Sequence, residues 1–396
     1  MKVYIVGTGM DGRNTLTAEA KNAIENAGVL IGAERMLCPF SDSGKELYNT
    51  YKTSDIAKKI NDCSCDTAAV LMSGDCGFFS GTRKLLPVLE GHDVTVIPGI
   101  SSAVYFCSKL GLSYENMKFI SLHGKSSNVA VYVRMNERCF FLLGGETTAS
   151  DICKRLCDYG MDDIIVYIGT DLCYENEDII VGKASELTDI ATRGLAVLIT
   201  ANSRYLGCLP SAIDDDRFIR SEIPMTKSEV RSIALSKLNI RNDSVVWDIG
   251  CGTGSVSVEA AFRCPDGKVF AFDKKHEAAE LTLKNASHFG CDNITVSEGI
   301  CPDILADAPI PDKVFIGGTS GNMSTVFDCI HAKNPEAEIV VTAVSLETLH
   351  DSTECFEKYG YSHEIIQISV TRTKRFGSHT MLQGQNPVYI ISGRRK

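Results

Sequence analysis

The 396-residue sequence has no Cys-x-x-Cys pair, no long apolar run and no excess of basic residues. A membrane span needs roughly 18–20 consecutive apolar residues, and zinc sites usually draw on closely spaced cysteine pairs. The 40 basic residues are outnumbered by 50 acidic ones, for a net charge of −10, which is unlike the basic footprint of a nucleic-acid binder. We therefore expect no membrane, metal or nucleic-acid partner.

The sixteen cysteines are scattered singly, with the closest neighbours at Cys63 and Cys65 and at Cys153 and Cys157. The first residues read as a strand and lack the apolar core of a signal peptide. We expect reduced thiols, most of them buried as small hydrophobic side chains, in a cytoplasmic protein.

Short β-branched runs alternate with amphipathic stretches along the chain, which predicts an α/β protein with mainly parallel sheets. A single core stops growing near about 250–300 residues, so this length predicts more than one domain. In the N-terminal half the predicted strands are 2–6, 68–72, 93–97 and 164–168, and the predicted helices are 16–27, 78–89 and 101–110.

The alternation breaks between residues 201 and 222, where turn formers and a charge cluster replace the periodic pattern. It resumes with a predicted helix at 227–238 and a strand at 244–249. We therefore predict a domain over residues 1–208, a linker over 209–221 and a second domain over 222–396.

The strongest motif, Asp248-x-Gly250-x-Gly252-x-Gly254, lies between a predicted strand and a predicted helix. Glycine allows a tight turn and lets a ligand approach the backbone, and a helix N-terminus presents free N–H groups. Asp273, 23 residues beyond Gly250, ends the next strand, where a carboxylate can accept both ribose hydroxyls of a nucleoside. A dinucleotide site would require glycine at Ser255, so the spacing favours the pattern of class I S-adenosylmethionine methyltransferases.

The remaining strands of this half are predicted at 268–272, 293–297, 313–316, 338–342, 364–370 and 388–392. They bring the sheet to seven strands, and residues 371–387 are long enough for an antiparallel hairpin between the last two.

Four segments of this half, 224–231, 315–322, 344–349 and 385–391, resemble the cobalamin-biosynthetic methyltransferases of the CbiT type. That family methylates carbon 15 of a corrin precursor and decarboxylates its ring-C acetate. The resemblance implies that the cofactor is held by Thr226, Gly250, Cys251, Gly252, Thr253, Gly254, Asp273 and Cys301.

The N-terminal half opens with another strand and glycine-rich turn, containing Gly7, Gly9 and Gly12. This spacing alone would allow a dinucleotide site, although the following helix starts late for one. Segments 71–80, 96–102 and 111–124 each place small residues after a strand, so their turns can share the ligand-binding rim of an open sheet. Gly124-Lys-Ser126 is no phosphate-binding loop, because the pattern needs glycine where Phe119 stands.

Together these segments resemble the tetrapyrrole methylase family of the CbiE type, which binds folded S-adenosylmethionine between two α/β lobes. The resemblance implies that Gly7, Gly9, Gly74, Asp75, Ser101 and Ser102 hold a second cofactor molecule. Asp75 is also a candidate catalytic residue, or simply the N-cap of the helix predicted at 78–89. His123 is expected to be a rim histidine rather than a base.

As a whole the chain resembles the precorrin-6Y methyltransferase (decarboxylating) family, a fusion of these two domains. The resemblance implies methylation of carbon 5 by one half and of carbon 15 by the other, with one S-adenosylmethionine per domain, and it suggests a homo-oligomer. Alternatives are methylation of RNA or of another small molecule, or a half that binds cofactor only as a scaffold.

A corrin precursor carries many carboxylates, so an acidic enzyme must present local cations. The candidates are the predicted hairpin with Arg372, Lys374 and Arg375, and Lys227 and Arg231 in the first helix of the second domain. The basic residues of the hairpin could equally be solvent-exposed charges with no role in binding.

Overall fold

The computed structural model describes all residues except 124–127, 146, 193, 208–211 and 396. The chain forms two compact units. The first contains residues 1–125, 138–151 and 165–200, and the second contains residues 126–137, 152–164 and 201–396. In the described part of the chain no helix is both long and apolar enough to span a bilayer.

The first unit begins with a five-stranded parallel sheet of order β3-β2-β4-β1-β5. Its strands are β1 (Lys2–Gly7), β2 (Val29–Gly32), β3 (Glu46–Asn49), β4 (Thr67–Met72) and β5 (Asp93–Ile97). Side chains alternate between its faces: Val3 and Ile5 pack with α3 (Thr53–Asp62) and α4 (Thr82–Leu85), and Val6 packs with α1 (Ala18–Asn26) and α2 (Glu34–Leu37).

A second five-stranded sheet has the order β6-β7-β10-β8-β9. Its strands are β6 (Met117–Ser121), β7 (Arg138–Leu142), β8 (Ile165–Thr170), β9 (Asp178–Lys183) and β10 (Ala196–Ala201). Helix α5 (Ser102–Leu110) packs Phe106 against Phe140 and Ile199 of this sheet. The segment between β6 and β8 also contains α6 (Ala130–Met135) and α7 (Ala149–Asp158).

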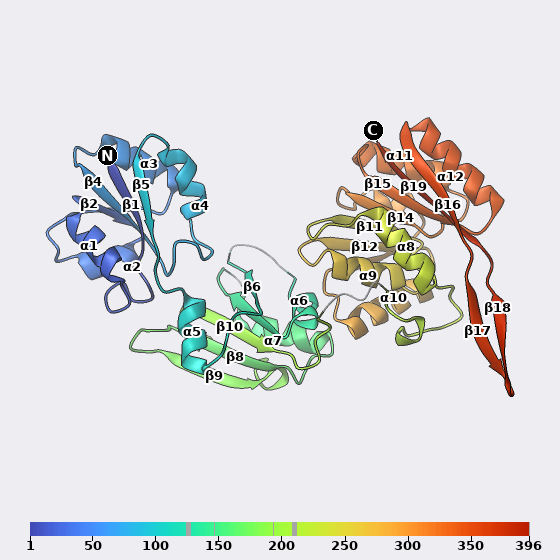
Figure 1. Cartoon of the computed structure of the whole chain (residues 1–396), viewed down its shortest axis with the longest axis horizontal. Helices are drawn as coiled ribbons and strands as arrows, with labels where there is room; N and C mark the ends of the chain where they lie inside the picture. Colours follow the sequence, from blue (N-terminus) through green and yellow to red (C-terminus); the bar gives the residue numbers. More distant parts are fainter. Residues whose placement is uncertain (124–127, 146, 193, 208–211, 396) are drawn as a thin grey trace. The chain divides into compact units, whose positions relative to one another are not determined.

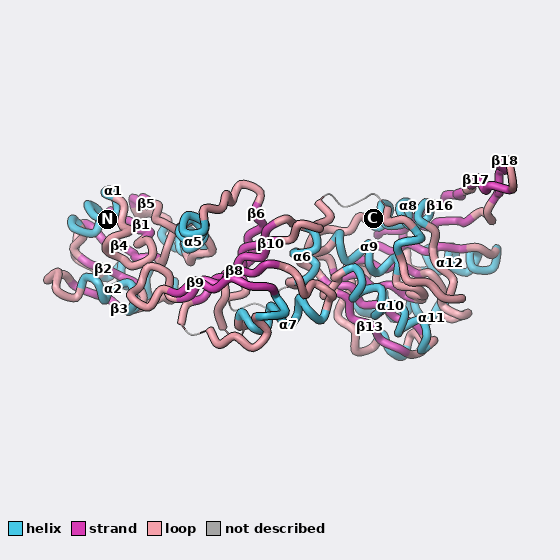
Figure 2. The backbone as a smooth tube through the Cα atoms, turned by 90° about the horizontal axis from the view of Figure 1, so that it is seen from below, coloured by secondary structure: helices cyan, strands magenta, loops and turns pink. Residues whose placement is uncertain are grey.

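The second unit is built on a seven-stranded sheet of order β13-β12-β11-β14-β15-β19-β16, in which β19 runs antiparallel to both its neighbours (Figure 1). Its strands are β11 (Val245–Ile249), β12 (Lys268–Asp273), β13 (Ile294–Glu298), β14 (Lys313–Ile316), β15 (Glu338–Ala343), β16 (Tyr361–Ile368) and β19 (Val388–Arg395). The predicted hairpin is the two-stranded ribbon β17 (Thr371–Phe376) and β18 (His379–Gly384), which extends away from this sheet in Figures 1 and 2.

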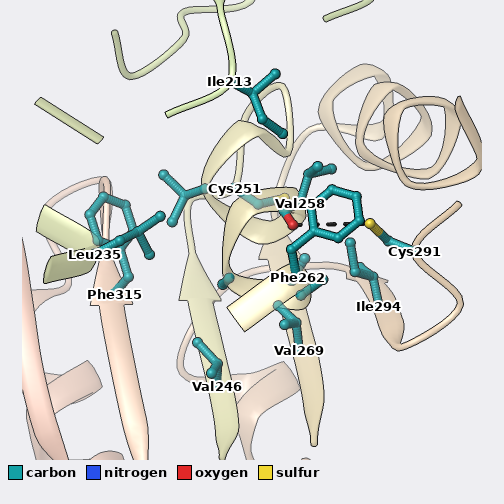
Figure 3. Packing of buried hydrophobic residues seen from close by; sticks show 14 of the residues in the cluster. Ile213, Leu235, Val246, Cys251, Val258, Phe262, Val269, Cys291, Ile294 and Phe315 are labelled. Carbon is teal, nitrogen blue, oxygen red and sulfur yellow. Dashed lines mark hydrogen bonds between the residues drawn. The ribbon is translucent and has the colours of Figure 1, made fainter. Parts of the chain in front are cut away.

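Helices cover both faces of the seven-stranded sheet, because its central strands are apolar on both sides. One face carries α8 (Ser228–Leu238), α9 (Ser255–Arg263) and α10 (His276–Phe289), whose side chains pack against Val246, Val269 and Phe315 (Figure 3). The other face carries α11 (Met323–Lys333) and α12 (Leu346–Lys358), packed against Trp247 and Val341. This three-layer arrangement leaves the carboxyl ends of the parallel strands free to form a site.

Two expectations are corrected by the structure. The helix expected at 78–89 begins only at Thr82 and continues from Leu86 as a 3-10 turn, since Pro87 cannot supply a helical N–H. Cys63 and Cys65 form a disulfide, so these two are not free thiols.

Residues of the predicted linker pack against the second unit rather than lying free. Ile213, labelled in Figure 3, and Phe218 are both buried in the core of this unit, and Phe218 packs on the ring of Phe289 with centroids 4.7 Å apart. Residues 208–211 lie outside the described residues, so the boundary near residue 210 stays a prediction.

Candidate active sites

The glycine loop of the second unit connects the end of β11 to the start of α9. Gly250 has a φ of +75°, and a Cβ there would lie 2.6 Å from the carbonyl oxygen of Gly318, in the loop after β14. Any larger residue would push these two loops apart. The glycine is therefore required by the contact between two loops at the carboxyl edge of the sheet, a reason that the motif alone does not reveal.

Asp273 is held in place beside this loop. Its Oδ2 accepts a hydrogen bond from the backbone N–H of Gly252 at 3.0 Å, and its Oδ1 accepts one from Lys275 N–H at 3.0 Å. Both bonds come from backbone, which fixes the carboxylate plane while leaving its other lone pairs available. The predicted ribose-binding acid is thus oriented before any ligand arrives.

A cavity of about 650 Å³ opens over the loop and brings together segments distant in the sequence. Its lining includes six of the predicted cofactor residues: Thr226, Gly250, Cys251, Gly252, Asp273 and Cys301. Thr253 and Gly254 belong to the loop but do not line the cavity. Thr253 is buried, and a Cβ on Gly254 would lie 2.8 Å from Thr282 Cγ2.

Asp248, the first residue of the motif, lies beneath the loop and is fully buried. Its Oδ2 accepts a hydrogen bond from the Ser257 hydroxyl, whereas Oδ1 has no partner among the described residues. Desolvation by burial raises the pKa of this carboxyl to about 7.

The cations around this cavity differ from the predicted set. Lys227 lines it, together with Lys274 and Lys275, which sequence reasoning missed although they directly follow Asp273. Arg372, Lys374 and Arg375 lie on β17 and are not part of the described lining. These three lysines are the cations of the described lining.

Arg231 must be removed from the substrate candidates, because its side chain is completely buried. Its Nε donates to Glu259 Oε1 at 2.6 Å, and its terminal nitrogens donate to the carbonyl oxygens of Thr226 and Ile213 at 2.6 and 2.5 Å. It also forms an ion pair with Asp215 at 3.3 Å. Arg231 therefore organises the wall that carries Thr226 and does not face a ligand.

Arg372 is likewise engaged with protein carboxylates. Its Nε and one terminal nitrogen donate to the two oxygens of Glu229 at 3.0 and 2.6 Å, a bidentate pair, and the same terminal nitrogen lies 3.3 Å from Asp215. These bonds tie the base of the ribbon to the first turn of α8. Lys374 and Arg375 are exposed further along the ribbon.

In the first unit, the glycine-rich turn is likewise built on backbone contacts. Gly9 and Gly74 exchange two backbone hydrogen bonds of 3.0 and 2.9 Å, which join the loops after β1 and β4. A Cβ on Gly7 would lie 2.6 Å from the backbone nitrogen of Gly99. Three loops of the same sheet edge are thereby pressed together.

A cavity of about 470 Å³ lies against these loops. Gly74, Asp75, Ser101 and Ser102 line it as predicted, and so does the rim residue His123. Gly7 and Gly9 are not in the described lining and instead support the turn. Ser101 also caps α5 by accepting a hydrogen bond from Val104 N–H at 3.2 Å.

Asp75 does not cap a helix, although the sequence allowed it to be the N-cap of the helix predicted at 78–89. Its Oδ1 accepts from Gly77 N–H at 2.8 Å and its Oδ2 from Gly99 N–H at 3.0 Å, so it bridges two loops seven residues before α4 begins. The carboxylate is an oriented part of the cavity wall. Its catalytic role stays a prediction.

Sequence reasoning also missed Arg35, Tyr51, Ser73 and Tyr174, which line the same cavity. Ser73 directly precedes the predicted Gly74 and could have been found by position. Arg35, Tyr51 and Tyr174 come from segments without a recognisable motif, and only the fold brings them together.

The residues present fit S-adenosylmethionine in the second unit. The fixed carboxylate of Asp273 suits a ribose diol, and the glycine loop allows close approach of a ligand to the backbone. In the first unit, the cradle of Gly74, Asp75, Ser101 and Ser102 offers backbone and hydroxyl groups of the kind a nucleoside needs.

Family models match both halves of the chain. Residues 2–188 match the tetrapyrrole (corrin/porphyrin) methylases, and residues 217–395 match the precorrin methyltransferase domain. A probable cobalt-precorrin-6B C(15)-methyltransferase (decarboxylating) of Pyrobaculum calidifontis is 42% identical over 183 residues, which cover 46% of this chain and 94% of the relative.

Two solved structures are also similar. The precorrin-6Y C5,15-methyltransferase of Geobacter metallireducens is 38% identical, with 48% of this chain and 98% of that chain covered and a TM-score of 0.45. The precorrin-6Y methylase of Archaeoglobus fulgidus is 20% identical, with 51% and 98% covered and a TM-score of 0.42. On the strength of the Pyrobaculum relative and the matching domain model, the chain belongs to the precorrin methyltransferase family and is an S-adenosylmethionine-dependent methyltransferase.

Proposed function

We propose that the chain methylates a precorrin-6 or cobalt-precorrin-6 type macrocycle twice in cobalamin biosynthesis. The second unit methylates carbon 15 and removes the ring-C acetate as carbon dioxide, and the first unit methylates carbon 5. The observation that carries the proposal is the pair of separate cavities, each built on glycine loops at the carboxyl ends of parallel strands. The name of the Pyrobaculum relative supports the carbon-15 reaction.

S-adenosylmethionine, when bound, supplies an electrophilic methyl group on a sulfonium, so the protein needs to provide position rather than a nucleophile. In the second unit Asp273 and the backbone of Gly252 orient the nucleoside. Lys227 and its neighbours Lys274 and Lys275 pair with substrate carboxylates at the cavity mouth, which accounts for an acidic protein binding a polyanion.

The first unit uses a different set of groups for the same task. Its loops are crosslinked through Gly9, Gly74 and Asp75, so the cradle for the second cofactor molecule is rigid. Rigidity matters because methyl transfer depends on reacting atoms held in line at near-attack distance. We therefore propose one cofactor site in each unit.

Calorimetric titration of S-adenosylmethionine into the full chain tests the two sites. We expect a stoichiometry of two, falling to one in Asp273→Asn at cofactor concentrations that saturate the remaining site. A wild-type stoichiometry of one would contradict the proposal, whereas an unchanged value of two in Asp273→Asn would remove Asp273 from the second unit's site.

The proposal also includes the oligomeric state of the protein and its location in the cell. We expect a cytoplasmic homo-oligomer, and sedimentation of the purified chain at several concentrations measures the subunit number. A monomer at all concentrations would overturn this part alone.

A further inference from the structure

Arg35 stands where the cavities of the first unit meet. It lines the 470 Å³ cofactor cavity and an adjacent cavity of about 770 Å³, and both are also bordered by Tyr51 and Tyr174. A substrate that reacts with a cofactor in the first cavity must approach through an adjoining space. A substrate that enters from the adjacent cavity therefore passes Arg35.

The guanidinium of Arg35 is held by neutral oxygens. Its two terminal nitrogens donate to Tyr174 Oη at 3.0 Å and to Ser73 Oγ at 2.9 Å. Among the residues that the structure describes, no carboxylate lies within ion-pairing distance of it. Three of its five N–H donors remain available, in the planar arrangement that suits a carboxylate.

The two acids that share the adjacent cavity do not neutralise this charge. Asp11 accepts hydrogen bonds from the backbone of Arg13, Asn14 and Thr15, so its oxygens are committed to its own loop. Glu34 lies beside Arg35 in α2 but makes no ion pair within the described residues. A substrate carboxylate would thus meet an uncompensated cation.

The partner Tyr174 is placed by a strained loop. Asp171 and Cys173 both have positive φ, +44° and +71°, a conformation that residues other than glycine rarely adopt. The loop is pinned by Asp171, which accepts from Leu195 N–H at 3.1 Å, and by Glu177, which accepts from Cys173 N–H at 2.6 Å. Such strain persists where the surrounding structure imposes it, commonly at functional sites.

We propose that Arg35 binds a carboxylate of the macrocyclic substrate at the first unit's site and that Tyr174 and Ser73 position its guanidinium. The inference rests on the proposed function, because it takes carbon-5 methylation to occur in this unit. Arg35 is then a determinant of substrate binding there, with no part in binding cofactor or in the chemistry of the second unit.

The test uses the full-length chain with a precorrin-6 type substrate, following methyl addition by mass spectrometry and carbon dioxide release separately. In Arg35→Gln we expect KM for the carbon-5 methylation to rise about ten-fold or more, as for the loss of a charged hydrogen-bonded pair. The affinity for S-adenosylmethionine and the rate of carbon dioxide release should be unchanged. Arg35→Lys should recover part of the affinity, and Tyr174→Phe should raise KM less than Arg35→Gln.

The matched control is Arg83→Gln, since Arg83 is exposed on α4 and lies outside the lining of both cavities. It should leave every parameter at the wild-type value. An unchanged carbon-5 KM in Arg35→Gln, or an equal rise in Arg83→Gln, overturns the role of Arg35. A wild-type product with a single added methyl overturns the proposed function itself, so the two failures are distinct.

Discussion

Asp248 combines complete burial with an oxygen that has no partner among the described residues. Its folded-state pKa of about 7 lies above its ordinary value of 3.8, so between these values the folded chain holds a proton that the unfolded chain releases. The contribution of this group to stability is therefore complete below about pH 4 and is lost as the pH rises towards 7.

We predict that the free energy of unfolding of the second unit falls between pH 4 and 7 more steeply in the wild type than in Asp248→Asn. The difference should be on the order of a few kcal/mol. Urea titrations followed by the fluorescence of Trp247, the single tryptophan, report on this unit. If the free energies of unfolding of the wild type and Asp248→Asn changed with pH in the same way, the pKa of Asp248 would not be raised in the folded protein, and the prediction would be wrong.

Asp273 provides a second residue-scale test. Asp273→Asn keeps an oxygen for Gly252 N–H but loses the charge that strengthens hydrogen bonds to ribose hydroxyls, so we predict a ten-fold or greater loss of cofactor affinity in the second unit. Isothermal titration measures it, with Asp307→Asn as control because Asp307 is an exposed acid outside the cavity. Equal affinities for the two variants would remove Asp273 from the site.

Asp273 and Arg231 show what could and could not be predicted about single residues from the sequence. Asp273 could be predicted because its role depends on spacing from a glycine loop. The burial of Arg231 could not, since it depends on Glu259 from α9 and Asp215 from the predicted linker reaching the same point. A motif identifies a charged residue without showing which carboxylates surround it.

At the scale of elements, Arg231 joins α8, α9 and the segment before α8 into one wall. Replacing it with methionine leaves the buried Glu259 without the cation that donates to it, whereas Asp215 keeps its ion pair with Arg372, and we predict a loss of about 3–5 kcal/mol in unfolding free energy. The double variant Arg231→Met, Glu259→Met should be less destabilised than Arg231→Met alone. Trp247 fluorescence in urea measures both, and a double variant as unstable as the sum of its single changes would contradict the account.

Enzyme kinetics can distinguish the contribution of the cavity lysines to substrate binding from that of the ribbon. We predict that Lys227→Ala raises KM for carbon dioxide release several-fold, since Lys227 lines the cavity, while Arg375→Ala, on the exposed ribbon, changes it little. Cofactor affinity serves as the check on folding. The opposite order of effects would assign substrate binding to the ribbon.

Most elements could be predicted from periodicity, because strands and helices buried on a defined face carry a regular apolar pattern. The seven strands and the ribbon of the second unit lie where residue patterns predicted them. The helix expected at 78–89 was shortened because Pro87 removes an N–H and Phe79 adopts a positive φ of +48°. A positive φ at a single residue leaves no periodic pattern in the sequence from which it could be predicted.

At the scale of the whole molecule, the net charge of −10 requires a polycarboxylate to be bound by a minority of cations. Lys227, with Lys274 and Lys275, lines the cavity of one unit, and Arg35 lines that of the other. The sequence alone favoured the ribbon, since clustered basic residues are visible in a sequence and cations gathered by folding are not.

We propose that the two units of one chain carry out two different methylations on one macrocycle. Mass spectrometry of the product formed from a precorrin-6 type substrate and excess S-adenosylmethionine tests it most directly. We predict two added methyl groups and the loss of one carbon dioxide. A product with one added methyl, or with its carboxylates intact, would contradict it.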